Sequence, residues 1–325
     1  MSGTGRPLEA LLDRDIKPKE TLIEGVGDAV DVEVGGASDE DALIEDLEGK
    51  EMLYTTSRLP VTERVLREAD SLRFIGKFGT GLDTLDLAAA ERHGVTVTYT
   101  PGLNASSVAE MGLTLLLAVR RNVAIGERAL DAGKWRDEVP NARLVSGTSV
   151  GIVGFGNVGS RLAGLLDGFN ADVYTHDPYV HEIDTEITGA TLTDLETTLS
   201  KPDAVVVCAE HTDETRGMMD ADAFEAMRSS AVLVNVARGP IVDTAALVDA
   251  LASGAIAGAG LDVFETEPLP PDHRLHDFEN VVTTPHIAGS TFHARSGIIE
   301  TLVSVTNDYL DGREIPERFV AARPA

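Results

Sequence analysis

The sequence predicts an α/β protein with two domains, each built on a mostly parallel β-sheet, the second inserted into the first. Three observations lead to this prediction. Short apolar segments alternate with helix-like segments along most of the 325 residues, a pattern typical of parallel sheets covered by helices on both faces. The alternation breaks at Pro101-Gly102 and restarts at Ser149. A long helix-like segment at 290–310 follows the second series and could return the chain to the first domain.

In the first series, short apolar runs predict strands, and polar residues before a helical apolar period predict helix starts. Strands are expected at 8–12, 29–34, 52–55, 72–76 and 95–99, with helices at 19–25, 38–47, 62–69 and 86–93. A strongly apolar helix is expected at 106–121, too long for a local crossover. The segment 131–146 is loop-like, and its Trp135 is expected to fill a packing gap rather than contact a ligand.

The second series has the same architecture. Strands are expected at 149–153, 171–175, 204–208, 231–236, 257–261 and 281–284, with helices at 160–167, 194–199, 221–227 and 244–253. The predicted domains are therefore residues 1–104 with 291–325, and residues 105–290. The long helices at 106–121 and 290–310 would flank the hinge between them.

A glycine-rich motif, Gly154-Phe155-Gly156-Asn157-Val158-Gly159, stands where a strand should end and a helix should begin. Gly154 would permit the tight turn, Gly156 would let a pyrophosphate approach the backbone, and Gly159 would let the helix pack closely on the strand. The phosphates would face the N–H groups and the positive end of the helix dipole. The alternative is a glycine-rich turn without a ligand.

An acidic residue in the right place favours the dinucleotide interpretation. Asp177 stands just past the next predicted strand, 21 residues after Gly156, where a carboxylate would hold both hydroxyls of an adenosine ribose. The same carboxylate would repel a 2′-phosphate, and Pro178 and Tyr179 supply no cation to bind one. The sequence therefore predicts a Rossmann/flavodoxin-like protein whose inserted domain binds NAD in preference to NADP.

The charge balance excludes several partners. The chain has 54 acidic and 27 basic residues, for a net charge of −27, so we expect binding to neither nucleic acid nor membrane. The acidic residues are scattered, which favours a dispersed acidic surface suited to a salt-rich cytosol and less stable at low salt. Residues 1–20 do not resemble a signal peptide, and the single cysteine, Cys208, should be buried and inert. These features predict a cytoplasmic protein.

Three polar residues follow predicted strands at their carboxyl ends, where parallel sheets bind ligands. They are Arg238, Glu267 and His286. Each has an alternative interpretation, as a surface charge, a turn residue before proline and a loop histidine respectively. Six further histidines match no catalytic pattern, and no spacing predicts a metal site; these are His93, His176, His181, His273, His276 and His293.

The residues around this trio resemble the D-2-hydroxyacid dehydrogenases, which include phosphoglycerate, glycerate and glyoxylate/hydroxypyruvate dehydrogenases. The similar segments in the second series are 235–243, 261–264 with Glu267-Pro268, and 285–289. In the first series they are 79–86 and 104–110. The resemblance extends from about Thr55 to His286 and beyond.

The resemblance implies a role for each residue. His286 would donate or accept the reacting proton, because imidazole titrates near neutral pH. Glu267 would orient His286 and favour its charged form, and Arg238 would grip the carboxylate and polarise the carbonyl of a small 2-hydroxy or 2-keto acid. Thr80, Gly81 and Asn104 would complete the substrate site, with Asp262 holding the nicotinamide carboxamide. The implied cofactor contacts are Gly154, Gly156, Asn157, Val158, Gly159, Asp177, Ala209, Thr212, Val236, Ala237, Asp262 and Gly289.

The family also implies a homodimer with the nucleotide domain at the interface, and a cleft between the domains that closes on the substrate. An alternative from another class stays open. The C-terminal-binding corepressors share this fold and the catalytic trio, so the chain could instead be an NAD(H)-sensing binding protein with little turnover. Turnover of small 2-keto acids distinguishes the two.

The sequence departs from the family pattern at several places. Glu210-His211-Thr212 replaces a usual Pro-Leu-Thr in the loop expected over the adenosine, and Asn157 replaces a frequent Arg or Lys, leaving phosphate binding to backbone N–H groups. A substrate-binding Arg of phosphoglycerate enzymes aligns near Thr56, with Arg58 close by. The chain stops soon after the predicted helix at 290–310, so we expect no C-terminal regulatory domain.

Overall fold

The computed structural model describes residues 6–324, and the chain divides into two compact units. One unit comprises the residues up to Asn104 together with those from Ser290 onward, and the other comprises Ala105–Gly289. The sequence placed the second boundary one residue later. The ends of the predicted first domain, residues 1–5 and 325, lie outside the described residues.

The N-terminal unit is built on a six-stranded sheet in the order β13-β5-β4-β3-β1-β2. All neighbouring strands are parallel except β13, which pairs antiparallel with β5. The strands β1 to β5 have the order of flavodoxin-like sheets. The order in which they are added reverses between β1 and β3. The strands are β1 (Leu8–Asp13), β2 (Val30–Gly35), β3 (Met52–Thr55), β4 (Phe74–Lys77), β5 (Thr96–Thr98) and β13 (Val320–Ala322).

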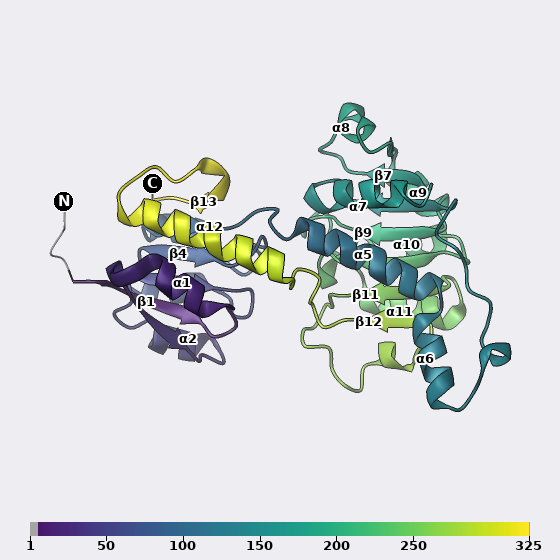
Figure 1. Ribbon diagram of the computed structural model, residues 1–325, viewed down its shortest axis with the longest axis horizontal. Helices are drawn as coiled ribbons and strands as arrows, with labels where there is room; N and C mark the ends of the chain where they lie inside the picture. Colours follow the sequence, from purple (N-terminus) through teal and green to yellow (C-terminus); the bar gives the residue numbers. More distant parts are fainter. Residues whose placement is uncertain (1–5, 325) are drawn as a thin grey trace. The chain divides into compact units, whose positions relative to one another are not determined.

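Helices cover both faces of this sheet (Figure 1). One face packs against α1 (Lys19–Val26) and α12 (Phe292–Leu310), and the other against α2 (Glu40–Asp46), α3 (Glu63–Glu68) and α4 (Leu87–Arg92). The side chains of Asp39, Thr62 and Asp86 cap α2, α3 and α4, as their polar residue types predict. Buried Tyr54 on β3 donates a hydrogen bond to Thr306 on α12 (3.1 Å), which joins the two ends of the chain in one unit.

The second unit contains a seven-stranded, fully parallel sheet in the order β12-β11-β10-β9-β6-β7-β8. This is the Rossmann order extended by one strand. The order in which the strands are added reverses between β6 and β9. Ligands of such sheets bind outside the carboxyl ends of the strands at that point. The strands are β6 (Ser149–Val153), β7 (Asp172–His176), β8 (Thr191–Leu192), β9 (Ala204–Val207), β10 (Val232–Asn235), β11 (Gly258–Leu261) and β12 (Val281–Thr283).

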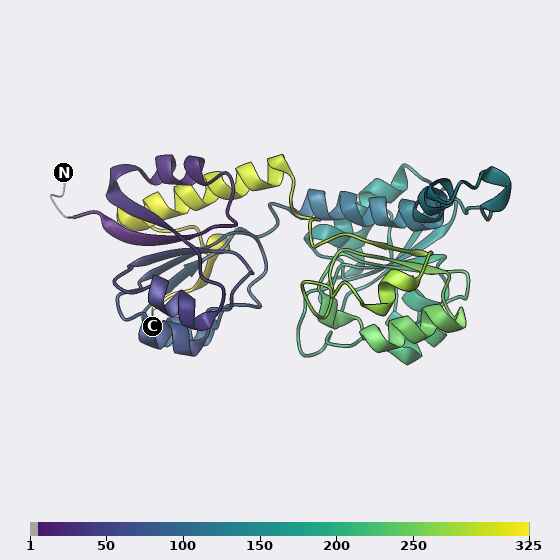
Figure 2. The same ribbon diagram turned by 90° about the horizontal axis from the view of Figure 1, so that it is seen from below.

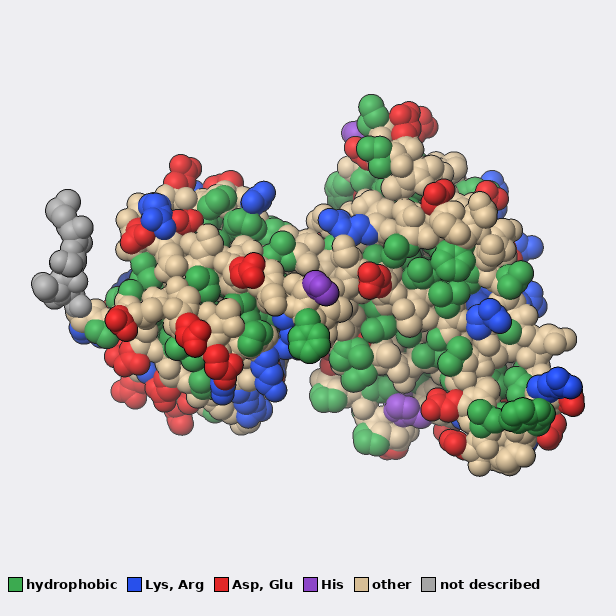
Figure 3. All heavy atoms as spheres, viewed as in Figure 1, with side chains coloured by type: hydrophobic (Ala, Val, Ile, Leu, Met, Phe, Trp, Pro, Cys, Tyr) green, Lys and Arg blue, Asp and Glu red, His purple; other side chains and the backbone are tan. Residues whose placement is uncertain are grey.

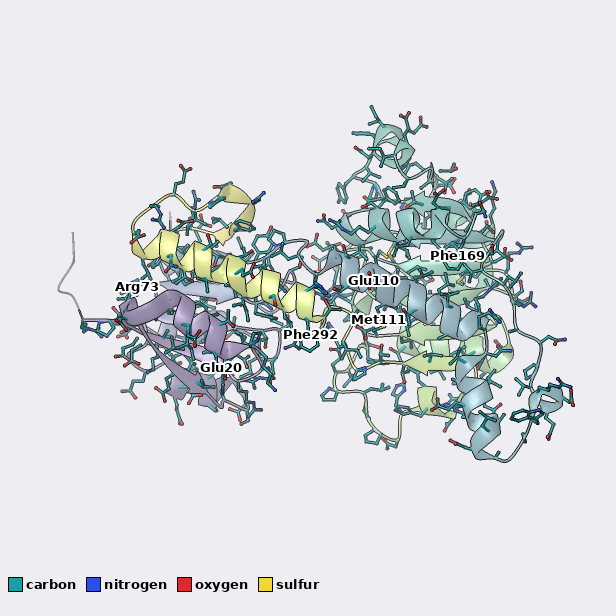
Figure 4. All side chains as sticks on the ribbon, viewed as in Figure 1. Glu20, Arg73, Glu110, Met111, Phe169 and Phe292 are labelled. Carbon is teal, nitrogen blue, oxygen red and sulfur yellow. The ribbon has the colours of Figure 1, made fainter. Side chains whose placement is uncertain are left out.

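Two apolar cores lie on opposite faces of the second sheet (Figure 2). One includes α5 (Ala105–Arg120) and α7 (Asn157–Asp167), and Met111 and Phe169 pack against it (Figure 4). The other includes α9 (Leu195–Ser200), α10 (Ala221–Ala226) and α11 (Thr244–Ser253). Strands buried on both faces explain the continuous apolar runs in the sequence.

Two helices and two edge strands were not predicted from the sequence: α6 (Val123–Asp131), α8 (Glu182–Glu186), β8 and β13. Their apolar side chains are partly or largely exposed, so their sequences lack the usual buried stripe. The packing prediction for Trp135 is wrong, because this side chain is 67% exposed. Residues 131–138 around it are all exposed, so no apolar core lies beside this side chain.

Acidic side chains are spread over the visible surface of each unit, in agreement with their scattering along the sequence (Figure 3). Within residues 6–324, no helix combines the length and apolar character needed to span a bilayer.

Candidate active site

The glycine motif forms the turn between β6 and α7, and two of its glycines are required by the backbone. Gly154 has a φ of +91°, and a Cβ there would lie 2.5 Å from the backbone of Ala209. A Cβ at Gly159 would lie 2.2 Å from the carbonyl oxygen of Gly154. Only glycine therefore allows α7 to pack this closely on β6.

Gly156 has a different environment, since a Cβ built there would meet no atom within 4 Å. It occupies the N-cap position of α7, and its lack of a side chain leaves that helix without a side-chain cap. The first-turn N–H groups, from residues 157–159, have no acceptor inside the helix and lie at its positive dipole end. An open backbone surface beside an uncapped helix N-terminus fits the pyrophosphate of a dinucleotide.

The Asp177 carboxylate lies beside this turn, directly after β7. Its Oδ2 accepts a hydrogen bond from the Phe155 N–H (2.8 Å), and its Oδ1 accepts one from the Tyr179 N–H (2.9 Å). An ionised carboxylate has about four acceptor positions, so both oxygens retain capacity for ribose hydroxyls. The backbone bonds hold the charge against the glycine turn, where the adenosine ribose of a bound dinucleotide would lie.

The loop after β9 packs against the glycine turn, because the backbone of Ala209 lies next to Gly154. In this loop the Nε2 atom of His211 is buried without a hydrogen-bond partner among the described residues. A buried polar atom is costly unless a ligand or water pairs with it, so this atom fits a site that a polar ligand occupies. Burial raises the pKa of the Cys208 thiol to about 12, which keeps it protonated and unreactive at neutral pH.

Arg238 follows β10 on a segment that the buried Asn235 side chain holds in place. The Asn235 Nδ2 donates to the Arg238 carbonyl (3.0 Å), and its Oδ1 accepts from the Ala237 N–H (3.0 Å). The guanidinium Nη1 donates to the Ala237 carbonyl (2.8 Å). A Cβ at Gly239 would lie 1.9 Å from the backbone of Phe264, so this segment lies directly against the loop after β11.

That loop carries Glu267, which pairs with His286. The His286 Nδ1 lies 2.7 Å from Glu267 Oε2, and Glu267 Oε1 accepts from the Phe264 N–H (3.0 Å). An ionised carboxylate only accepts, so Nδ1 carries the proton and Nε2 is the free ring position for proton transfer. Burial alone would raise the pKa of Glu267, but the hydrogen bonds from His286 and Phe264 and the positive charges of His286 and Arg238 outweigh it and lower the pKa.

The backbone of His286 is unusual, with a φ of +52° that non-glycine residues seldom adopt. Asp262, which is 0% exposed, supports this segment through hydrogen bonds. Its Oδ1 accepts from the Ile287 N–H (2.9 Å) and from the Thr284 hydroxyl (2.6 Å), and its Oδ2 accepts from the Ala288 N–H (2.8 Å). The Asp262 carbonyl accepts from the His286 N–H (2.8 Å). The structure therefore shows Asp262 supporting the segment that carries His286.

All these residues lie at one edge of the sheet, because the carboxyl ends of parallel strands share an edge. The expected cofactor residues that follow each strand are Gly154, Gly156, Asn157, Val158 and Gly159 after β6, Asp177 after β7, Ala209 and Thr212 after β9, Val236 and Ala237 after β10, Asp262 after β11, and Gly289 after β12. The trio thus lies on the same edge as the glycine turn.

The expected substrate residues of the N-terminal unit lie at the carboxyl edge of its own sheet. Thr80 and Gly81 follow β4, and the Thr80 hydroxyl lies 3.1 Å from Asn104 Oδ1 and 3.2 Å from the Thr100 carbonyl. The Thr100 hydroxyl in turn accepts from the Gly79 N–H (3.1 Å). These bonds hold the loop after β4 against the segment after β5.

The comparisons with known proteins agree with this geometry. The family model for the "D-isomer specific 2-hydroxyacid dehydrogenase, NAD binding domain" matches residues 113–288, more than half of the chain. The chain belongs to the D-isomer specific 2-hydroxyacid dehydrogenase family. The matched region covers the glycine turn, Asp177 and the trio, so the second unit is the NAD-binding domain of this family.

Members of the family with different substrates are similarly related to the chain. It is 36% identical over 269 residues to the D-3-phosphoglycerate dehydrogenase of Archaeoglobus fulgidus, covering 83% of this chain and 51% of that protein. It is 35% identical over 292 residues to the glyoxylate reductase of Thermofilum pendens, covering 87% and 86% respectively. The solved structure of the TT0316 protein from Thermus thermophilus superposes with a TM-score of 0.89 at 32% identity, covering 97% of this chain and 100% of that one. The chain thus spans about half the length of the phosphoglycerate dehydrogenase.

Two functional features of this family member were not predicted. The strained backbone of His286 and its support by Asp262 depend on contacts between residues 22 to 26 positions apart, which no local pattern reveals. The unpaired Nε2 of His211 also escaped, although His211 itself was noted as a departure. Within the described part of the chain, no group of three or more His, Cys, Asp and Glu side chains could hold a metal ion.

Replacing Glu267 by glutamine is expected to change the pH dependence of stability. A carboxyl with a lowered folded pKa stabilises the fold above its unfolded value of 4.5, and this contribution disappears as the pH falls through the folded pKa. The wild type should therefore unfold at a higher temperature than the Glu267→Gln variant above pH 4.5, with the difference vanishing in more acidic buffer. Thermal melts from about pH 6 down to about pH 3 measure it.

Glu265→Gln provides the matched control, since Glu265 is an exposed carboxylate of the same loop. It should show no such pH-dependent difference. A constant difference between wild type and Glu267→Gln at every pH would contradict the charge-based account of the pair.

Proposed function

We propose that the chain is an NAD-dependent dehydrogenase that interconverts a small D-2-hydroxy acid and its 2-keto acid, with His286 as the acid/base. The observation that supports this best is the Glu267–His286 pair, 2.7 Å apart, at the sheet edge that carries the glycine turn and Arg238. A proton relay, a guanidinium and a dinucleotide site together supply what 2-keto acid reduction requires. NADH, when bound, would supply the hydride.

The side chains divide the remaining work. Arg238 would bind the substrate carboxylate and polarise the carbonyl, as a rigid planar cation does well. Nε2 of His286 would deliver a proton to the alkoxide oxygen that develops on C2, while Glu267 holds Nδ1 and stabilises the imidazolium. In the N-terminal unit, the backbone N–H groups of Thr80 and Gly81 would add donors for the carboxylate, and Asn104 would fix the loop through Thr80.

The preference for NAD over NADP is part of this proposal. Asp177 lies against the glycine turn, and the loop Glu210–Glu214 carries three further acidic residues. Tyr179 donates to Glu214 (3.0 Å), which joins the segment after Asp177 to that loop. Negative charge on both segments disfavours a 2′-phosphate.

The proposal is tested by following NADH oxidation in molar KCl with glyoxylate, hydroxypyruvate, phosphohydroxypyruvate, pyruvate and 2-ketoisocaproate, and with NADPH in parallel. Turnover of at least one 2-keto acid, with NADH preferred, is the expected result. Absence of turnover across the panel with NADH still bound would favour the NAD(H)-sensing alternative. A strong preference for NADPH would contradict the role given to Asp177.

We also propose that the family's homodimer forms through the segment 123–144 of the NAD-binding domain. This segment exposes four large apolar side chains: Val123, Leu130, Trp135 and Leu144. A contiguous exposed apolar patch marks an interaction surface, and we propose that these four side chains form one. The double variant Leu130→Ser/Trp135→Ser should sediment as a monomer, whereas Ile187→Ser, which removes a 96% exposed side chain just after α8, should leave the dimer intact. A monomeric wild type would refute the proposal.

A further inference from the structure

The carboxyl edge of the N-terminal sheet holds a compact charged cluster, formed by Asp13, Asp15 and Arg58. The Arg58 Nε donates to Asp13 Oδ1 (3.2 Å) and lies 3.2 Å from Asp15 Oδ2, while its Nη1 donates to the Ala37 carbonyl (2.6 Å). Asp13 is buried and also accepts from the Thr56 hydroxyl (2.8 Å). The guanidinium is therefore held by two carboxylates, and the cluster has a net charge of −1.

This cluster lies where the topology predicts ligand binding. Asp13 ends β1 and Arg58 follows β3. The strand order of this sheet reverses between those two strands. In open parallel sheets, ligands bind outside the carboxyl ends of the strands at the switch point. The cluster thus belongs to the part of the unit best placed to contact a ligand.

The cluster is also one strand away from the proposed carboxylate donors. Thr80 and Gly81 follow β4, the neighbour of β3, and the Lys77 Nζ at the end of β4 donates to Ser57 Oγ (2.8 Å). Neighbouring strands lie about 4.8 Å apart. A substrate anchored by its carboxylate at Thr80 and Gly81 would therefore lie next to residues 56–58, close enough for a substituent on C2 to meet them.

A phosphate on that substituent would meet unfavourable charges. It carries about −1.5 to −2 at pH 7, and the Asp13 and Asp15 carboxylates both lie against the Arg58 Nε, so that two negative charges face the one positive charge of the guanidinium. Two other cations lie at this edge. Lys77 is only 1% exposed and is bonded to the Ser57 hydroxyl, and Arg14, directly after β1, donates to the Gly36 carbonyl (3.2 Å) after β2, the strand on the opposite side of β1 from β3. A hydrogen or a hydroxymethyl group carries no charge, and the hydroxyls of Thr56 and Ser57 suit a neutral polar group.

We propose that the Asp13–Asp15–Arg58 cluster selects against phosphate, so that the substrate is an unphosphorylated small 2-keto acid of the glyoxylate or hydroxypyruvate type. This inference rests on the proposed function for the location of the substrate. It separates two substrate classes among relatives of nearly equal identity, the phosphoglycerate dehydrogenase and the glyoxylate reductase.

The first test compares kcat/KM for hydroxypyruvate and phosphohydroxypyruvate with the full chain and NADH. We expect hydroxypyruvate to be favoured by at least roughly a hundredfold, since repulsion by two carboxylates adds to the loss of a free cation. Equal or better use of phosphohydroxypyruvate would overturn the inference and leave the proposed function standing.

A binding measurement keeps the two proposals distinguishable if nothing turns over. Calorimetry with the NAD-loaded protein compares D-glycerate with D-3-phosphoglycerate. Tighter binding of D-glycerate supports selection against phosphate even in a protein without turnover. Tighter binding of D-3-phosphoglycerate, or equal or absent binding of both, overturns it.

The variant Asp15→Asn tests the cluster itself, since Asp15 is exposed and its replacement should not disturb folding. Removing one carboxylate from Arg58 should shift the ratio of kcat/KM values toward phosphohydroxypyruvate by roughly tenfold. Asp28→Asn makes the same change of charge at an exposed position of the same unit and should leave the ratio unchanged. An unchanged ratio in Asp15→Asn, or an equal shift in Asp28→Asn, would show that the cluster does not set the selectivity.

Discussion

The His286→Ala variant is expected to lose turnover by about 10²- to 10⁴-fold, the usual contribution of a positioned general acid. Without the imidazole, no described side chain replaces the Nε2 that the Glu267 hydrogen bond orients. Binding of NADH should be retained, because the glycine turn and Asp177 lie on other strands of the sheet. Steady-state kcat and NADH fluorescence titration measure the two effects.

His276→Ala is the matched control, a histidine on a short turn of the same unit that the trio does not include. It should keep wild-type turnover and NADH affinity. If His286→Ala also kept its turnover, His286 would not be the acid/base. If it lost NADH binding in parallel, the loss of turnover would report on the cofactor site.

The glycine turn could be predicted because its causes are local. Gly154 needs a positive φ, Gly159 needs to lack a side chain, and both residues belong to one short motif in the sequence. The same holds for Asp177, whose place follows from the end of one strand. Strand and helix positions were also predictable where segments are buried, because strands buried on both faces give short continuous apolar runs and helices buried on one face give a period of 3.6.

The features that escaped prediction depend on distant or missing neighbours. Trp135 looked like a packing residue because aromatic residues usually are, yet its loop has no core beside it. The pair of Glu267 and His286 was expected from family resemblance, whereas their 2.7 Å contact depends on how two loops fold. The left-handed backbone of His286 depends on a carboxylate 24 residues earlier.

That carboxylate leads to the second large effect, a loss of kcat by roughly 10²-fold in the Asp262→Asn variant. The asparagine amide could accept with only one atom, so the N–H of Ile287 or Ala288 would lose its acceptor in a buried site. An unpaired buried donor costs about 1–3 kcal/mol, comparable to the strain of about 1–3 kcal/mol that a non-glycine residue bears in the left-handed region. The segment would then relax and move Nε2 of His286 away from its position.

Stability alone must be separated from this positioning effect. Asp220→Ala removes the N-cap of α10 in the same unit, where the Asp220 side chain accepts from the Ala223 N–H (2.9 Å). It should lower the free energy of unfolding by about 1 kcal/mol and leave kcat unchanged. A kcat of Asp262→Asn close to that of the wild type would contradict the positioning role.

The affinity for NADH then decides what Asp262 does. If its carboxylate held the nicotinamide carboxamide directly, the dissociation constant for NADH should rise together with the loss of kcat. Because the side chain is 0% exposed and accepts three hydrogen bonds from the segment 284–288, we expect NADH affinity to change far less than kcat. The split between kcat and NADH affinity in one variant therefore tells whether Asp262 acts through His286 or through the cofactor.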